Sequence, residues 1–297
     1  MAPQYSGDDF KVSNLYDVKD KVALVTGGGS GIGLMIVQAL AINGAKVYIT
    51  GRTEEKLEKV AELYGKDIDG QIIPISADVG KKSEVARLVN EIESKEKCLC
   101  ILVNNAGISK ASHTVSESKD ADEMKKNMFD DESNTYEEWT ETYQTNVAAT
   151  YFLTTACLPL LQRATETHKG YSGCVINITS ISGLVRVSQH HPAYNASKAA
   201  QIHLSNMLGA EIVDAGLKIR VNNIAPGVYP SEMTTQESGE DQKSHIPKEQ
   251  FEGKVPANRP GSERDMASAV IFVATNQYLN GVTLHVDGGY VLKAGRV

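Results

Sequence analysis

Residues 21–33 read Lys-Val-Ala-Leu-Val-Thr-Gly-Gly-Gly-Ser-Gly-Ile-Gly, an apolar run that ends in a glycine-rich turn. The run 21–26 suits a short strand buried on both faces of a parallel sheet. Apolar residues recur with helical periodicity over 32–43, and 46–50 is a second short apolar run. The order of strand, turn, helix and strand predicts a βαβ unit with the glycines at its first turn.

The same alternation continues to the end of the chain. We expect further strands at 71–76, 100–103, 174–179, 218–224 and 282–286. We expect helices at 54–64, 83–93, 135–163, 192–214 and 263–275. This pattern predicts an α/β fold, a Rossmann-type doubly wound parallel sheet of about seven strands with helices on both faces. Residues 1–20 are expected to be an N-terminal tail and residues 21–297 a single domain.

Two irregular stretches interrupt the alternation. Residues 109–134 are polar, rich in acidic side chains and poor in large apolar ones, which predicts a solvated surface insertion. Residues 229–258 hold Met233 and Phe251 among prolines and polar residues. Their length and position predict a mobile lid over a substrate site.

Composition and charge exclude several classes of function. The 297 residues are 41% hydrophobic and 23% charged, with a formal net charge of -7. The chain has no apolar run near the roughly 18 residues that cross a bilayer. Its acidic balance argues against nucleic acid or an anionic membrane as a partner. The polar, acidic first residues lack the features of a signal or transit peptide, so we expect a cytoplasmic protein.

The cysteines and histidines do not form a recognisable metal motif. One Cys-x-Cys pair has no second pair of the kind that zinc sites need. The seven histidines contain no His-x-x-x-His, and the adjacent His190 and His191 are expected in a loop. We therefore expect no metal and interpret the cysteines as reduced core thiols: Cys98, Cys100, Cys157 and Cys174.

Tyr194 and Lys198 are four residues apart in the expected helix 192–214. This spacing puts the phenol and the ammonium on one helix face, about one turn apart. A free phenol titrates near pH ~10, and a lysine cation beside it would stabilise the phenolate and lower its pKa. Tyr194 would then serve as general acid and base. The alternative is a packed tyrosine beside a solvated lysine.

The glycine-rich turn predicts a nucleotide site. Gly27, Gly31 and Gly33 would let the backbone approach a pyrophosphate at the positive end of the following helix. The alternative is a turn that only connects two elements. The next strand ends in Thr50-Gly51-Arg52-Thr53, with no carboxylate to hold a ribose hydroxyl. Arg52, with Thr53 as a second donor, could pair with a 2'-phosphate, which favours NADPH/NADP+, although Arg52 could also be merely solvated.

Six motifs in order make the chain resemble the short-chain dehydrogenase/reductase family over residues 21–290. Within that family it most resembles the 3-oxoacyl-carrier-protein reductase-like and fungal carbonyl reductase branches. The motifs are Thr26-Gly-x-x-x-Gly-x-Gly33, Asn104-Asn-Ala-Gly107, Asn146 in Thr-Asn-Val, Ser180 after a strand, Tyr194-x-x-x-Lys198, and Pro226-Gly227.

The resemblance implies a catalytic set of Asn146, Ser180, Tyr194 and Lys198. Ser180 would hold a carbonyl oxygen and Tyr194 would donate the proton. Lys198 would lower the tyrosine pKa and bind the nicotinamide ribose, and Asn146 would hold a water that relays protons to it. The family usually has its serine thirteen residues before the tyrosine, whereas Ser180 lies fourteen before Tyr194 and Ser182 twelve before. We favour Ser180, with the extra residue in the loop 189–192, and Ser182 stays possible.

The resemblance also implies a set of cofactor contacts. Asn104 and Gly107 would lie against the cofactor and steady the sheet, Asp78 and Val79 would border the adenine, and the Pro226 segment would pass the nicotinamide. The full expected set is Gly27, Ser30, Gly31, Ile32, Gly33, Arg52, Thr53, Asp78, Val79, Asn104, Ala106, Gly107, Tyr194, Lys198, Pro226, Gly227, Val228 and Ser231.

A mostly apolar substrate pocket is expected near these residues. It would be formed by Leu184, Val185, His190, His191, Tyr229, Met233 and Phe251. We therefore expect an NADPH-dependent reductase of a ketone, and by resemblance a homotetramer. Two alternatives are an NAD-linked alcohol dehydrogenase or C=N reductase of the same fold, and a nucleotide-binding scaffold or sensor without turnover.

Overall fold

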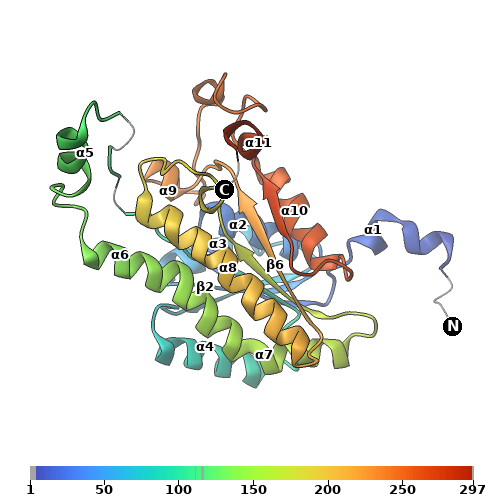
Figure 1. Ribbon diagram of the computed structural model, residues 1–297. Helices are drawn as coiled ribbons and strands as arrows, with labels where there is room; N and C mark the ends of the chain where they lie inside the picture. The colour runs from blue at the N-terminus through green and yellow to red at the C-terminus, as the bar shows by residue number, and fades with distance from the viewer. Residues whose placement is uncertain (1–4, 111, 115–116, 296–297) are drawn as a thin grey trace.

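The central sheet is built from parallel strands alone in the computed structural model, which describes residues 5–110, 112–114 and 117–295 (Figure 1). Within these residues seven strands pair in the order β3-β2-β1-β4-β5-β6-β7. They are β1 (Val22–Thr26), β2 (Lys46–Gly51), β3 (Gln71–Ser76), β4 (Ile101–Asn104), β5 (Gly173–Ile178), β6 (Ile219–Pro226) and β7 (Thr283–Val286). The doubly wound sheet expected from the sequence is confirmed.

Helices cover both faces of the sheet. One face packs against α2 (Gly31–Ile42), α3 (Glu54–Tyr64) and α10 (Glu263–Thr275). The other packs against α4 (Lys82–Lys95), α7 (Ala149–Thr167) and α8 (Pro192–Asp214). The remaining helices are α1 (Val12–Leu15), α5 (Ala121–Met128), α6 (Tyr136–Tyr143), α9 (Glu232–Thr235) and α11 (Tyr290–Ala294). Short 3-10 turns lie at Gly7–Phe10, Ile181–Gly183 and Lys248–Phe251.

The apolar strands have no polar face because both faces are covered. In β1, Ala23 and Val25 point to the cluster under α2, whereas Val22 and Leu24 point to the cluster under α4 and α7. All five residues of β1 are buried. The chain runs from β1 to β2 on one side and later adds β4 on the other. The crevice at the carboxyl ends of β1 and β4 is therefore the topological switch point, where such sheets bind ligands.

The expected helix 135–163 is a more complex element. It consists of α6, a π-helical segment Gln144–Ala148, and α7, which contains Pro159 and continues to Thr167. π-Helical turns within helices often occur at functional sites. Here the turn carries Asn146, so this irregular segment is part of the candidate site described below.

The structure shows where the expected tail packs and which elements the insertion and the lid contain. In the tail, Val18 is 1% exposed and joins the core, so the packed body begins before residue 21. The insertion 109–134 contains α5, which stands away from the sheet in Figure 1. The segment 229–258 contains α9 and the turn Lys248–Phe251. Residues 1–4, 111, 115–116 and 296–297 of these predicted ranges lie outside the described residues. No helix in the described part is both long and apolar enough to span a membrane.

Candidate active site

The glycine-rich turn between β1 and α2 is shaped by close backbone contacts. Gly27 has φ 65°, a left-handed conformation that favours glycine. A Cβ on Gly33 would collide with the Gly27 carbonyl oxygen. The Asn105 amide donates to the carbonyl oxygens of Thr26 (2.8 Å) and Gly27 (3.2 Å). The turn is thus held against the end of β4, and the backbone N–H groups at the start of α2 remain available for an anion.

Two neighbouring asparagines at the end of β4 have different partners, although the sequence analysis considered Asn104 alone. The Asn104 amide is buried and donates to Thr154 Oγ1 (3.0 Å) and Asn177 Oδ1 (2.8 Å). Its side chain steadies the sheet, as expected, and its amide is directed into the sheet, so the predicted cofactor contact of Asn104 would fall to its backbone and stays a prediction. Asn105, which the prediction omitted, holds the glycine-rich turn. Its place in the same motif was the available signal.

The ends of β2 and β3 carry the residues expected near the adenosine half of a cofactor. The Arg52 side chain is exposed and makes no hydrogen bond or ion pair within the described residues. Thr53 is the N-cap residue of α3. After β3, Asp78 accepts a hydrogen bond from the Gly80 N–H (3.0 Å) and pairs with Lys81 (3.6 Å). Arg52 is therefore a cation available to a ligand at the tip of β2.

An ion pair joins the expected lid to α3, beside the glycine-rich turn. Lys56 Nζ is 2.6 Å from Glu232 Oε1 at the start of α9. Burial raises the pKa of Glu232, but hydrogen bonds from Lys56, Ser238 and Ser30 outweigh it and lower the pKa below its ordinary value. A Cβ on Gly31 would lie 2.9 Å from Ser231 Cβ, so the start of α9 packs on the turn. Neither Lys56 nor Glu232 was predicted, because residues so far apart in sequence form no motif.

Ser180 and Tyr194 meet at the carboxyl end of β5. Ser180 follows the strand, Tyr194 lies in the first turn of α8, and the Ser180 hydroxyl lies close enough to the phenol to lower the pKa of Tyr194. Ser182 donates its backbone N–H to Ser180 Oγ (3.1 Å) and its hydroxyl to Gln189 Oε1 (2.7 Å). Ser180 therefore contacts Tyr194, while the Ser182 hydroxyl is directed to the loop. Gln189 and His190 have positive φ values of 51° and 67°, in the loop expected to hold the extra residue.

Lys198 lies beside the Tyr194 ring, with Nζ 5.7 Å from the ring centroid. Its ammonium donates to the Ile178 carbonyl oxygen (3.0 Å) and to Gln201 Oε1 (2.9 Å). Burial lowers the pKa of Lys198 to about 7. Burial also raises the pKa of Tyr194, and the hydrogen bond with Ser180 offsets part of this. The expected lowering of the Tyr194 pKa by Lys198 is wrong for this structure, because the ammonium is directed to Ile178 and Gln201 and not to the phenol oxygen.

Asn146 connects the π-helical turn to the other candidate catalytic residues. Its Oδ1 accepts from the Ile108 N–H (2.9 Å), and its Nδ2 donates to the Ile108 carbonyl oxygen (3.0 Å) and to Ser197 Oγ (3.0 Å). A Cβ on Gly107 would lie 3.2 Å from Asn146 Oδ1 and 3.5 Å from Lys198 Nζ. The chain thus brings Asn146, Ser180, Tyr194 and Lys198 to one edge of the sheet, beside Gly107.

The segment after β6 completes this edge. Pro226 is the last residue of β6, and the Gly227 N–H donates to the Val286 carbonyl oxygen (3.0 Å). A Cβ on Gly227 would lie 2.8 Å from Asp287 Cα, so this position needs glycine for close backbone approach. Val228 is partly exposed, and Ser231 caps α9.

The insertion is more closely packed than its composition suggested. The His113 N–H donates to the His190 carbonyl oxygen (2.7 Å), and the Ser109 hydroxyl lies 3.3 Å from His191 Nδ1. His113 is 2% exposed and lies 3.1 Å from Asp131, whose pKa Ser133 and His113 lower to about 2. The acidic residues of the insertion are mostly exposed, in keeping with the expected solvated lobe, whereas the part around His113 docks on the loop before Tyr194.

The expected pocket residues fall into four groups. Tyr229 and Phe251 line a cavity of about 270 Å³ together with Ile181 and Val228. Leu184 and Val185 are buried beside the catalytic segment, and His190 and His191 face the insertion. Met233 is 46% exposed on α9 and lies outside the cavity lining.

Comparisons with known proteins agree with this geometry. The family model described as short chain dehydrogenase matches residues 21–242. The chain is 38% identical over 284 residues to the short-chain dehydrogenase/reductase PhomF of Diaporthe leptostromiformis, covering 93% of each chain. It is 33% identical over 279 residues to the rhamnolipids biosynthesis 3-oxoacyl-[acyl-carrier-protein] reductase of Pseudomonas aeruginosa, covering 93% of this chain and 98% of that one.

A solved structure is similar over the same extent. The chain superposes with a TM-score of 0.75 and 32% identity on the structure titled Pseudomonas aeruginosa RhlG/NADP active-site complex, covering 93% of this chain and 98% of that one. The chain therefore belongs to the short-chain dehydrogenase/reductase family of oxidoreductases.

Proposed function

We propose that the protein is an NADPH-dependent reductase that converts a ketone to a secondary alcohol, with Tyr194 as the general acid. The observation that carries this proposal is the convergence of Ser180, Tyr194, Lys198 and Asn146 at one edge of the sheet, where Lys198 Nζ lies 5.7 Å from the centroid of the Tyr194 ring. A proton donor beside a second hydroxyl, with a buried lysine within reach, is the arrangement that general acid catalysis at a carbonyl oxygen requires.

The described residues fit a nicotinamide dinucleotide. The turn 27–33 offers backbone N–H groups at a helix start where side chains would collide, and Asn105 holds that turn in place. Arg52 has no described partner and would pair with a 2'-phosphate, which favours NADPH over NADH. Asp78 and Val79 would lie near the adenine, and the segment 226–231 near the nicotinamide. When bound, the cofactor supplies the hydride.

The catalytic residues would divide the remaining work. Ser180 would donate a hydrogen bond to the carbonyl oxygen and orient it toward Tyr194. Tyr194 would pass its proton to the developing alkoxide. Its raised pKa keeps the phenol protonated at neutral pH, which is the form that a general acid needs. Lys198, whose pKa is about 7, could take up and release protons near neutrality, and Asn146 would orient the polar groups beside it.

The surroundings support a ketone of moderate size with apolar groups. The cavity beside Ile181 is lined by Val228, Tyr229 and Phe251 but also by Arg259 and Asp265, which form an ion pair of 2.6 Å with each other. The docked insertion forms a wall on the side of His190. The apolar part of this lining suits the apolar groups of a ketone, and we propose a cytoplasmic enzyme that acts on a small molecule.

A homo-oligomer is part of the proposal. A surface groove of about 730 Å³ is lined by residues of α6, the π-helical turn, α7 and α8. Its lining includes Trp139, Tyr143, Tyr151, Phe152 and Leu204, and Phe152 is 39% exposed. An aromatic face of this kind favours a second copy of the chain, as in the expected homotetramer.

The experiment that tests the function is a fluorescence titration with NADPH and NADH, followed in the same sample by a panel of ketones. We expect tighter binding of NADPH and its oxidation by at least one ketone. A preference for NADH would overturn the cofactor assignment and favour an NAD-linked alcohol dehydrogenase. Tight binding without turnover of ketones, alcohols or imines would favour the sensor.

A further inference from the structure

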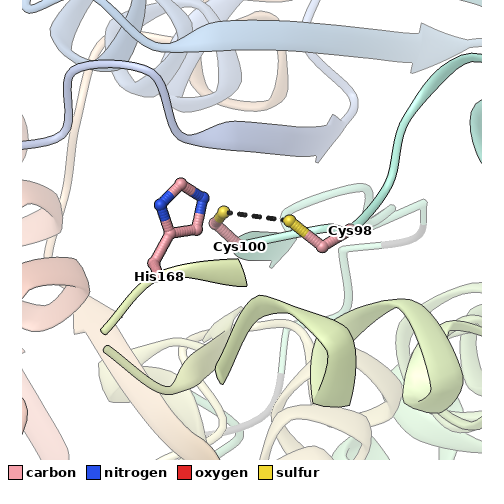
Figure 2. Close-up of side chains that lie close together, drawn as sticks. All are labelled: Cys98, Cys100 and His168. Carbon is pink, nitrogen blue, oxygen red and sulfur yellow. Dashed lines mark hydrogen bonds between the residues drawn. The ribbon is translucent and has the colours of Figure 1, made fainter. Parts of the chain in front are cut away.

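A cluster of two thiols and one imidazole lies at the edge of the sheet opposite the candidate active site (Figure 2). Cys98 and Cys100 directly precede β4, and His168 follows α7 and precedes β5. The ligand atoms that these three side chains offer all lie within 4.8 Å of one another. The amino ends of β4 and β5 are here, whereas Ser180 follows the carboxyl end of β5. The cluster is therefore separate from the site described above.

We propose that Cys98, Cys100 and His168 form a zinc site, with a solvent molecule as the fourth ligand. Thiolate sulfur and imidazole nitrogen are the ligands that zinc prefers, and two cysteines with one histidine and an open position is an established set. The sequence analysis expected no metal because the Cys-x-Cys pair lacks a second pair nearby. The fold supplies a third ligand from the end of α7.

The spacing of the sulfurs fits a shared metal ion. The Sγ atoms of Cys98 and Cys100 are 3.9 Å apart. Two sulfurs bound to zinc at about 2.3 Å with a tetrahedral angle would be separated by about 3.8 Å. A disulfide would require the same atoms to approach to about 2.05 Å. The thiols are thus already at the separation of two ligands of one zinc ion.

The backbone holds both thiols on one side of the sheet. The Cys100 N–H donates to the Val22 carbonyl oxygen (2.8 Å), and the Cys100 carbonyl oxygen accepts from the Cys174 N–H (2.9 Å). Leu99 between them packs in the core on the opposite face. This alternation is that of an extended strand, so the two side chains point the same way. Cys98 and Cys100 are 3% and 0% exposed, which restricts their movement.

The surroundings of the cluster leave it accessible to solvent and place a lysine beside His168. His168 is half-buried and Thr167 is exposed, so solvent can reach the open position. Lys21 Nζ is 3.4 Å from His168 Nδ1 and 5.2 Å from the centroid of the Tyr171 ring. Lys21 thus occupies one ring nitrogen and leaves Nε2 for the metal.

The zinc ion would link the start of β4 to the end of α7. Two thiolates neutralise its charge, so the Lys21 ammonium beside it limits the affinity without preventing binding. Because a preformed site binds the folded chain and not the unfolded one, bound zinc should stabilise the fold. We expect Tm to rise by several degrees in zinc, about 5 °C if the free ion is a hundred times its Kd.

The test measures zinc bound to the reduced, full-length chain. Metal-free protein is equilibrated with zinc and dialysed, zinc per chain is measured, and affinity is determined by competition with a chromophoric chelator. We expect one zinc per chain. The double variant Cys98→Ser/Cys100→Ser should lose affinity by more than about a hundredfold, more than the usual effect of removing a group behind a ligand. Cys157→Ala and Cys174→Ala, which alter the other two cysteines, should bind zinc like wild type.

A second variant keeps the test decisive if the buried serines prevent folding. His168→Gln alters a half-buried side chain and should weaken binding by about tenfold or more while circular dichroism stays unchanged. Cobalt in place of zinc should show thiolate charge-transfer absorption in wild type, and the double variant should lose it.

Three results would overturn the proposal. The first is reduced protein that holds no zinc after dialysis or binds it only at millimolar concentration, which would mean adventitious binding. The second is equal loss of zinc in Cys157→Ala and in the double variant. The third is oxidised protein lighter by two hydrogens combined with no zinc uptake by the reduced form, which would assign the pair a redox role.

Discussion

Lys56 and Glu232 form an ion pair, with Nζ and Oε1 2.6 Å apart, that connects α3 beside the glycine-rich turn to the start of α9. The Glu232 carboxylate also lies near Ser30, the N-cap residue of α2, which helps to lower the pKa of Glu232. A carboxylate therefore lies close to the helix start where a cofactor phosphate is expected. In this conformation the lid is fastened to the turn, and cofactor binding has to compete with that contact.

Replacing Glu232 by Gln should strengthen NADPH binding. The change removes a negative charge that competes with phosphate for Lys56 and the start of α2, an effect of about 1 kcal/mol, or roughly a fivefold lower Kd. Fluorescence titration measures it. Glu237→Gln changes the charge of the same segment away from the turn and serves as the control. Unchanged or weaker NADPH binding by Glu232→Gln would mean that Glu232 does not compete for the phosphate position.

Replacing Arg52 by Ala should weaken NADPH binding by about 2–3 kcal/mol and leave NADH binding nearly unchanged, because only NADPH carries the 2'-phosphate. The same titration with both cofactors gives the comparison. Arg264→Ala, an exposed arginine on α10, is the matched control. Equal losses for both cofactors would make Arg52 a structural residue.

Replacing Tyr194 by Phe should abolish ketone reduction while NADPH binds almost normally. The variant removes the hydroxyl that donates the proton and keeps the ring that packs beside Lys198. Steady-state rates and cofactor titration on the same preparation separate the two effects. More than a few per cent of residual activity would contradict the role of general acid.

The two candidate serines should differ strongly. Ser180→Ala should lower kcat by about a hundredfold or more, because it removes the hydroxyl beside Tyr194 that would hold the carbonyl oxygen. Ser182→Ala should change kcat only slightly, because that hydroxyl donates to Gln189. Rates of the two variants with one ketone provide the comparison. The opposite order would assign the catalytic hydroxyl to Ser182.

The sheet could be predicted because both of its faces are covered by helices, so each strand is a continuous run of apolar residues. A run such as Val22–Thr26 is apolar throughout, and each expected helix follows at the spacing of a crossover. The π-helical turn at Gln144–Ala148 could not be predicted, because one extra residue in a helix hardly alters its apolar periodicity. The motif Asn104-Asn-Ala-Gly107 likewise does not show which way each asparagine side chain points. In the structure the Asn104 side chain points into the sheet, and the Asn105 side chain points toward the glycine-rich turn.

Contacts between distant segments account for the remaining differences. Polar composition predicted a solvated insertion, yet His113 is buried against the loop that holds His190. Spacing rules found no metal motif around Cys98, because His168 reaches it only through the fold. The Tyr194–Lys198 spacing correctly placed the two side chains together. It could not give the direction of the ammonium, which Ile178 and Gln201 determine.

Lys198 should reduce the stability of the fold in a pH-dependent way. Burial lowers its pKa from 10.5 to about 7, so the folded chain binds its proton less tightly than the unfolded chain does. Below pH 7 both states are protonated, and the folded state carries the full cost of a buried charge, on the order of a few kcal/mol. Between pH 7 and 10.5 the folded state has released the proton, so the cost declines as pH rises. Lys198→Met should therefore raise Tm most at pH 6 and hardly at all near pH 10, while abolishing turnover. Thermal unfolding of both proteins across this range measures the difference, and a constant or growing advantage of Lys198→Met with rising pH would show that Lys198 is not a destabilising buried cation.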